Sequence, residues 1–573
     1  MGAELSQFFL APHPLGSGTR DTTTCVVQHR ADPGAPTVVL VTGLGVSMSE
    51  PRYLWAILAR ELAGQGLNVL QYDHPGQGDS SLTGRPATLD AVRTAARSVA
   101  EQGRRIGSGR LVIVGYGLGN LLVAELLRAG EAEAGVLICP ATHRWRAAAG
   151  HTASLSALAT RDRVAPDELQ DETAVALLLD ALVGEPYQPP QPAGAVGAAL
   201  LAAAAAAAGP AFAGLRGTRA LVIAADPRDR DWARRAGLPV REIDHEPTSW
   251  APTWHWSYEP RREVLDAVTG FVHDALAGPA PAGPPVPAAP VRTPPPAVTE
   301  SVSGPAGSRI SSLAFTSGGR RLLGVLHEPA PRPEGTPEPV CLIYEPGNPG
   351  QRVDIHECGP ALAHAGAARG VPVFRYDSRG MGVSDGSFTH STWSHRLEDL
   401  TAAMARLRAA GVAERFVVVG NSAGARLAAM AAHARPEVTG AVLWGPILSE
   451  DGEGPAPRLR RVEGTLAAEW CGLWQGVAYN RDDRGRDYLK LLRDSGVPVR
   501  VVYGDQEIDG DGPRTMLAEI ARRPSWDLSV VHGSHGFSSR GLAEAVRLTA
   551  DWAAAAARHP VPDAPVGGTV HDR

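Results

Sequence analysis

The feature that most constrains this chain is a duplication. Each half contains an apolar run, a glycine-rich turn and an Ala/Leu-rich helical pattern, in that order. In the C-terminal half, residues 416–419 (FVVV) lead into the G-N-S-A-G turn at 420–424; in the N-terminal half, residues 111–114 (LVIV) lead into G-Y-G-L-G at 115–119. Both have the strand, sharp turn and helix of a nucleophile elbow. Only the C-terminal copy has a nucleophile there, Ser422, where the other has Gly117.

A second pair of segments repeats in the same register. Residues 69–80 (VLQYDHPGQGDS) match residues 373–384 (VFRYDSRGMGVS), so that Asp73 corresponds to Asp377. Matched segments at a fixed long spacing indicate two copies of one domain, because solenoid repeats are far shorter.

Length and composition place the boundary between the copies. A chain of 573 residues fits two domains of roughly 250 residues each plus a linker. Residues 278–307 are dominated by Pro, Ala, Gly, Ser and Val, which is typical of a semi-extended spacer. We therefore expect an N-terminal domain at 1–277, a linker at 278–307, a C-terminal domain at 308–560 and a disordered tail at 561–573.

The repeated pattern predicts an α/β fold in which each domain has a mostly parallel sheet flanked by helices. A hairpin should open the second sheet, because residues 310–315 and 322–327 are strand-like and Gly318-Gly319 lie between them. Between later strands we expect cap insertions, at about residues 140–215 in the first domain and 446–495 in the second.

Charge and cysteine content exclude several classes of protein. The net charge is −6 and no basic block occurs, which argues against nucleic acid as a partner. Five scattered cysteines suggest neither a disulfide framework nor a metal site. No signal peptide is recognisable at residues 1–20, and the alanine-rich stretch around 198–208 is too weakly apolar to span a membrane. We expect a cytoplasmic protein with no cofactor.

Ser422 is the candidate nucleophile because it has both required flanks, a β-branched strand before it and a helical pattern at 425–432 after it. A second G-x-S-x-G sequence occurs at 382–386, with Ser384 at its centre. No helical periodicity follows it, so Ser384 is rejected.

The partners of such a serine follow it as an acid and then a histidine, each just past a strand. The strand-like run 499–503 leads into three carboxylates, of which Glu507 has the usual offset and Asp505 and Asp509 are alternatives. The run 528–531 leads into His532 and His535. His535 is preferred as the base because it lies a few residues beyond the strand, in a Gly/Ser loop.

An oxyanion hole would need two backbone N–H groups. One is that of Ala423, after the nucleophile; the other should come from the loop at 344–352, where Asn348 or Gly347 is favoured because proline has no N–H.

The N-terminal half contains the corresponding positions of a degenerate site. Its elbow residue is Gly117, Asp226 or Asp229 follows the strand-like run 220–223, and His245 or His255 comes later. Without a nucleophile, covalent catalysis is excluded there, and we expect a non-catalytic domain.

Short motifs also resemble a known family. The C-terminal half resembles the first type of exosortase-associated α/β-hydrolase, through residues 351–356 (QRVDIH), 361–363 (ALA), 371–377 (VPVFRYD) and 379–382 (RGMG). The N-terminal half resembles the second type, through residues 48–55 (MSEPRYLW) and 59–63 (ARELA). The resemblance implies acyl chemistry near acyl-activating and carrier proteins, and an N-terminal elbow without a usable serine.

The sequence therefore predicts a serine-dependent acyl hydrolase or acyltransferase that acts on an ester or thioester through an acyl-Ser422 intermediate. Its substrate would be a small-molecule or carrier-bound acyl group, and a homodimer is left open. Two rival hypotheses remain: a non-catalytic binding or assembly protein, and nucleophile-free chemistry in the N-terminal pocket.

Overall fold

A computed structural model of the chain describes most of both halves. The described residues are 5–11, 23–43, 47–48, 54–80, 87–140, 142, 198–244, 262–278, 297–331, 340–354, 357–448, 459–470, 473–533, 535, 537 and 539–556. The predicted tail at 561–573 and most of the first predicted cap lie outside them. None of the described helices is long and apolar enough to cross a membrane.

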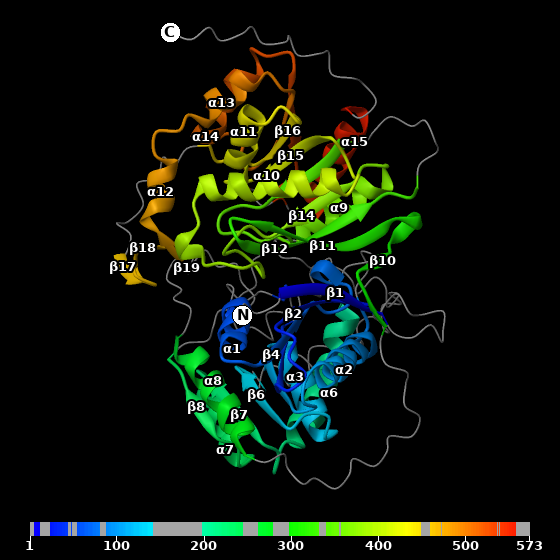
Figure 1. Cartoon of the computed structure of the whole chain (residues 1–573), viewed down its shortest axis with the longest axis vertical. Helices are drawn as coiled ribbons and strands as arrows, with labels where there is room; N and C mark the ends of the chain where they lie inside the picture. Colours follow the sequence, from blue (N-terminus) through cyan, green and yellow to red (C-terminus); the bar gives the residue numbers. More distant parts are fainter. Residues whose placement is uncertain are drawn as a thin grey trace, which may run out of the picture.

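The structure contains two nine-stranded sheets with the same strand order. One sheet lies in each half of the chain (Figure 1). Read from one edge, the first is β9-β1-β2-β4-β3-β5-β6-β7-β8 and the second is β10-β11-β12-β14-β13-β15-β16-β20-β21. In both, the first strands pair antiparallel and the rest parallel. The predicted fold class, two tandem domains with mostly parallel sheets, is confirmed.

The N-terminal half supplies the first sheet and its helices. Its elements are β1 (Leu5–Ala11), β2 (Thr24–His29), β3 (Thr37–Val41), α1 (Leu54–Gly64), β4 (Asn68–Tyr72), η2 (Gly78–Ser80), α2 (Leu89–Ile106), β5 (Leu111–Tyr116), α3 (Leu118–Arg128), β6 (Ala134–Ile138), α6 (Ala198–Ala213), β7 (Ala220–Ala224), α7 (Pro227–Arg235), β8 (Val240–Glu242), α8 (Arg262–Ala277) and β9 (Ala297–Thr299).

The C-terminal half supplies the second sheet and a small three-stranded sheet, β17-β18-β19. Its elements are β10 (Ser301–Ser303), η4 (Pro305–Gly307), β11 (Arg309–Ser317), β12 (Arg320–Glu328), β13 (Val340–Glu345), α9 (Cys358–Ala368), β14 (Val373–Tyr376), η6 (Phe388–His390), α10 (Trp393–Ala409), β15 (Arg415–Asn421), α11 (Gly424–Ala434), β16 (Val438–Trp444), β17 (Leu459–Val462), β18 (Thr465–Trp470), β19 (Leu473–Gly476), α12 (Val477–Asp483), α13 (Tyr488–Ser495), β20 (Val499–Gly504), α14 (Asp511–Ile520), β21 (Trp526–Val531) and α15 (Ser539–Ala556).

Helices cover both faces of each sheet, which explains why the central strands are apolar throughout instead of alternating. In the first domain, one apolar cluster joins a sheet face to α2, α3 and α6, and another joins the opposite face to α1 and α8. In the second domain, α10, α11 and α13 cover one face, and α9 and α15 cover the other. Each domain therefore has its own core on both sides of its sheet.

The predicted hairpin is formed by β11 and β12, with Gly318 and Gly319 in its turn at positive φ of 52° and 72°. The second cap is inserted between β16 and β20, where the described residues form the three-stranded sheet, α12 and α13. Of the first cap, α6 is the described part, and it packs on α3.

The end of the range predicted as linker takes part in both sheets. Residues 297–299 form β9, which pairs with β1, and residues 301–303 form β10, which pairs with β11. One residue, Glu300, separates the two strands. Residues 279–296 of the predicted linker lie outside the described part of the chain.

The two domains pack against each other through their opening hairpins (Figure 1), with β1 against β11 and β12. One buried apolar cluster contains residues of both: Leu5, Phe9, Cys25, Val27 and Met48 from the first domain, and Ile310, Leu323, Val325 and Val383 from the second. A smaller cluster joins Ala56 of α1 to Met381 and Phe388.

Close packing of α3 on the sheet leads to a prediction of stability. A Cβ at Gly119 would lie 2.1 Å from the carbonyl oxygen of Val41. We therefore expect Gly119→Ala to lower the free energy of unfolding by about 1–3 kcal/mol, measured by urea denaturation. Gly270→Ala in α8 is the matched control, because a Cβ there meets nothing within 4 Å. It should raise the free energy of unfolding, since alanine is more favourable than glycine in a helix by about 1 kcal/mol. Equal unfolding midpoints for the two variants would contradict this account.

Candidate active site

Ser422 lies at the sharp turn between β15 and α11, and its backbone has a positive φ of 54°. A non-glycine residue in this region is strained, so the surrounding structure must hold it. The Ser422 N–H donates to the Trp444 carbonyl at 2.8 Å, and the Ser422 carbonyl accepts from the N–H of Ile447 at 3.2 Å.

Two glycines make this turn possible. A Cβ at Gly424 would lie 2.4 Å from the carbonyl oxygen of Glu345, and a Cβ at Gly420 would lie 2.5 Å from that of Gly424. Since no side chain fits at either place, α11 begins directly against the end of β13.

Ser422, His535 and Glu507 form one chain of contacts. His535 Nε2 lies 2.9 Å from Ser422 Oγ, and His535 Nδ1 lies 2.7 Å from Glu507 Oε1. The histidine and glutamate side chains are 26% and 21% exposed, so the pair is largely shielded while the site stays reachable. A carboxylate on Nδ1 fixes the tautomer that leaves Nε2 free to take the serine proton.

The alternative acids lie elsewhere. Asp505 accepts from the Gly533 N–H at 2.9 Å and lies 3.1 Å from His532 Nδ1, on the surface. The Gly533 N–H and then His532 lower the pKa of Asp505. Asp509 is exposed. His532 and Asp505 therefore form a separate pair, and Glu507 is the carboxylate that contacts His535.

The loop after β13 passes beside the serine. A Cβ built at Gly347 would lie 3.5 Å from the Ser422 Cβ and 3.9 Å from its Oγ. Asn348 Nδ2 donates to Gln475 Oε1 in β19 at 3.3 Å, which ties the loop to the cap. The Ala423 N–H belongs to the first turn of α11, where helix N–H groups have no intrahelical acceptor. Both predicted sources of an oxyanion hole thus lie next to Ser422.

Sequence reasoning did not assign roles to several buried polar residues around this loop. Arg396 donates to the Pro346 carbonyl at 3.1 Å and lies 3.6 Å from the Glu345 carboxylate, and burial raises the pKa of Glu345 to about 7. Asp354 accepts from Tyr344 Oη at 2.7 Å and from Asn421 Nδ2 at 2.9 Å. In the sequence, the available signal was a charged residue at the end of an apolar strand, as at Glu345.

The N-terminal elbow has the same backbone without the side chain. Gly117 has a φ of 58°, close to that of Ser422, and is the single residue between β5 and α3, where it is the N-cap of α3. Gly115 and Gly119 repeat the close contacts of Gly420 and Gly424.

The two candidate acids of the N-terminal half, Asp226 and Asp229, make local hydrogen bonds. Asp226 caps α7, where it accepts from the Arg228 N–H at 2.8 Å and pairs with the Arg228 guanidinium at 2.7 Å. Asp229 is fully buried and accepts from the N–H and hydroxyl of Thr142, both at 2.9 Å. His245 and His255 lie outside the described residues.

The rejected serine is structural. Ser384 is buried, and its Oγ accepts from the Leu323 N–H at 2.9 Å, behind the opening hairpin of the second domain.

Comparison with known families agrees with this architecture. A model described as the alpha/beta hydrolase family matches residues 38–268, and one described as serine aminopeptidase, S33, matches residues 358–493, which contain Ser422. The chain carries two α/β-hydrolase domains. Two hydrolase matches in one chain support a hydrolase-type activity for this tandem α/β-hydrolase. A search of curated protein sequences finds no match.

Several solved structures are similar to part of this chain. Est1E from Butyrivibrio proteoclasticus with bound ferulic acid is 20% identical, covers 42% of this chain and 99% of its own, and has a TM-score of 0.35. The thioesterase domain from the curacin biosynthetic pathway is 17% identical over 43% of this chain and 98% of its own, with a TM-score of 0.32. The esterase domain of a Rhodothermus marinus protein is 14% identical over the same shares, with a TM-score of 0.31.

The contacts of His535 predict which carboxylate matters. Glu507→Gln should slow covalent labelling of the protein by a fluorophosphonate at least ~100-fold, because the imidazole loses the partner that fixes its tautomer. Asp505→Asn is the matched control and should label at close to the wild-type rate, since its partners are His532 and Gly533. The measurement is the second-order labelling rate. A larger loss of labelling rate in Asp505→Asn than in Glu507→Gln would show that Asp505 is the acid and that Glu507 is not.

Proposed function

We propose that the C-terminal domain is a serine hydrolase or acyltransferase that cleaves an ester or thioester through an acyl-Ser422 intermediate. The observation that carries this proposal is the continuous contact from Ser422 Oγ through the His535 ring to Glu507. The positive φ of Ser422 supports it further, because backbone strain at a serine with these neighbours is a property of nucleophile elbows.

The first half-reaction follows from this geometry. Ser422 Oγ attacks the acyl carbon while its proton passes to His535 Nε2, 2.9 Å away. The Glu507 carboxylate stabilises the imidazolium that forms. The negative charge on the acyl oxygen would be bound by the N–H of Ala423 and by an N–H of the loop at 347–348. When the carbon–oxygen or carbon–sulfur bond breaks, the leaving group receives the proton from His535.

The second half-reaction releases the acyl group. Water or another hydroxyl or thiol acceptor gives a proton to His535 and attacks the acyl-Ser422 carbonyl, and the proton then returns to Ser422 Oγ. The resemblance of both halves to exosortase-associated hydrolases adds a carrier-bound acyl thioester to the substrates that we propose.

We assign the N-terminal domain a non-catalytic role. Gly117 offers no attacking atom, and Asp226 is occupied with capping α7 and pairing with Arg228. A cytoplasmic location belongs to this proposal as well, on the composition described above.

Ser422→Ala tests the proposal. The variant should lose fluorophosphonate labelling completely and lose turnover of a chromogenic ester by several orders of magnitude, because no other group supplies the attacking oxygen. Intact mass after incubation with a panel of acyl-thioesters should show an acyl adduct on the wild type and none on the variant. Circular dichroism serves as the control for folding. Turnover near the wild-type rate in a folded Ser422→Ala protein would overturn the proposal and favour a binding or assembly role.

A further inference from the structure

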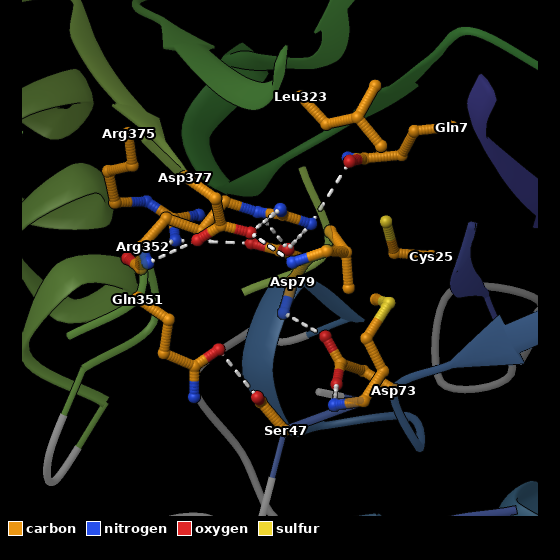
Figure 2. Close-up of polar contacts among 12 residues, drawn as sticks. Gln7, Cys25, Ser47, Asp73, Asp79, Leu323, Gln351, Arg352, Arg375 and Asp377 are labelled. Carbon is orange, nitrogen blue, oxygen red and sulfur yellow. Dashed lines mark hydrogen bonds and ion pairs between the residues drawn. The ribbon is translucent and has the colours of Figure 1, made fainter. Parts of the chain in front are cut away.

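A buried arginine crosses the boundary between the two domains. Arg352 of the C-terminal domain places its Nε and Nη2 at 2.7 and 2.6 Å from Oδ2 of Asp79, which belongs to the N-terminal domain (Figure 2). Its Nη1 lies 2.5 Å from Asp377 Oδ2, and its Nη2 also donates to Gln7 Oε1 in β1 at 3.0 Å. The Arg352 and Asp79 side chains are 2% and 1% exposed.

Asp79 binds a second guanidinium of the other domain. Arg375 Nη1 lies 3.1 Å from Asp79 Oδ1 and donates to the Arg352 carbonyl, also at 3.1 Å. Burial alone would raise the pKa of Asp79, but Arg352 and Arg375 outweigh burial and lower it. The N-terminal domain thus contributes a charged carboxylate to two arginines of the C-terminal domain.

Arg352 lies in the loop between β13 and α9, which passes beside Ser422. The first part of this loop, residues 346–352, is fixed at its start by Arg396 on the Pro346 carbonyl. Its end is fixed by the Arg352 N–H, which donates to Asp377 Oδ1 at 2.8 Å, and by the Arg352 side chain on Asp79. Gly347 and Asn348, the candidate oxyanion donors, lie between these two anchors. The loop is therefore in direct contact, through Arg352, with a residue of the other domain.

Both residues of this ion pair have apolar counterparts in the other domain. The N–H groups of Met48 and Asp79 donate to Asp73 at 2.6 and 2.9 Å, as those of Arg352 and Val383 donate to Asp377 at 2.8 and 3.0 Å. Met48 thus occupies the place of Arg352 in the first domain, and Val383 occupies the place of Asp79 in the second.

These counterparts also lie at the interface between the domains. Met48 and Val383 belong to one buried apolar cluster that contains residues of both domains. Ser47 and Gln351 precede Met48 and Arg352, and the Ser47 hydroxyl donates to Gln351 Oε1 at 2.7 Å between the domains (Figure 2).

The stability of the domain interface does not explain why Arg352 and Asp79 are charged while their counterparts Met48 and Val383 are apolar. The apolar cluster that contains Met48 and Val383 already joins the domains. A buried ion pair is on average no more stabilising than an apolar pair, because of its desolvation. The ion pair adds a defined orientation, because a planar guanidinium that binds two carboxylates fixes the position of the backbone that carries it. The charged version occurs on the loop next to Ser422.

We propose that Asp79 is a positioning residue for the active site of the other domain, acting through Arg352 on the loop that would supply an oxyanion donor. The N-terminal domain is then a dedicated partner of its catalytic neighbour. This inference rests on the proposed function of Ser422.

Asp79→Asn in the full chain tests this role, because it keeps the size of the side chain and removes its charge. We expect kcat per active site, counted by fluorophosphonate titration, to fall about 10–100-fold with little change in KM, since a displaced oxyanion donor acts on the transition state. Met48→Ala is the matched control. It removes apolar contacts from the cluster that contains residues of both domains, so it should lower thermal stability while kcat per titrated site stays near wild type.

Gln7→Leu keeps the test open if Asp79→Asn fails to fold. It removes a neutral cross-domain contact of Arg352 without leaving a carboxylate unpaired, and should lower kcat per titrated site severalfold. If Asp79→Asn folds, a wild-type kcat per site in this variant would overturn the positioning role. If it does not fold, a wild-type kcat per site in Gln7→Leu would overturn it. An equal fall in Met48→Ala would do the same, by showing a general effect of the interface. Failure of the wild type to label at Ser422 would instead remove the proposed function itself.

Discussion

Contact between the start of a helix and the end of a neighbouring strand is the constraint on which both domains depend. Gly424 lies against the carbonyl of Glu345, and Gly119 lies against that of Val41, at distances that exclude any side chain. In both halves the residue two positions before this glycine has a positive φ, whether it is Ser422 or Gly117. The turn therefore has nearly the same φ with or without a serine side chain, because the packing of helix on sheet specifies it.

Once the turn is fixed, the remaining parts of the candidate site come from three separate strand ends. His535 and Glu507 lie beyond β21 and β20, and the loop beside Ser422 follows β13. Parallel strands end at the same edge of a sheet, so residues far apart in the chain meet there. Such a site is only as well ordered as its loops, and the first domain acts on one of them through Asp79.

Much of this arrangement could be predicted from local sequence. The repeated strand–turn–helix pattern indicated two copies of one fold, Gly318-Gly319 indicated the hairpin, and the spacing after each strand selected Ser422, Glu507 and His535, which the structure brings together; their catalytic roles remain predictions. One local signal was not used. Asp226 precedes Pro227, which is typical of a helix start, and the structure places Asp226 at the N-cap of α7. The contact of Asp79 with Arg352 could not be predicted, because it depends on how two finished domains pack.

The passage of the chain from one sheet to the other has a consequence for the strength of the domain interface. β9 and β10 belong to different sheets and are separated by Glu300 alone. Two domains joined so closely face each other at a very high effective concentration, so their association is intramolecular and needs little affinity of its own. The interface residues therefore do not need to supply much binding affinity. A buried ion pair that adds little to binding can persist there for the orientation that it imposes.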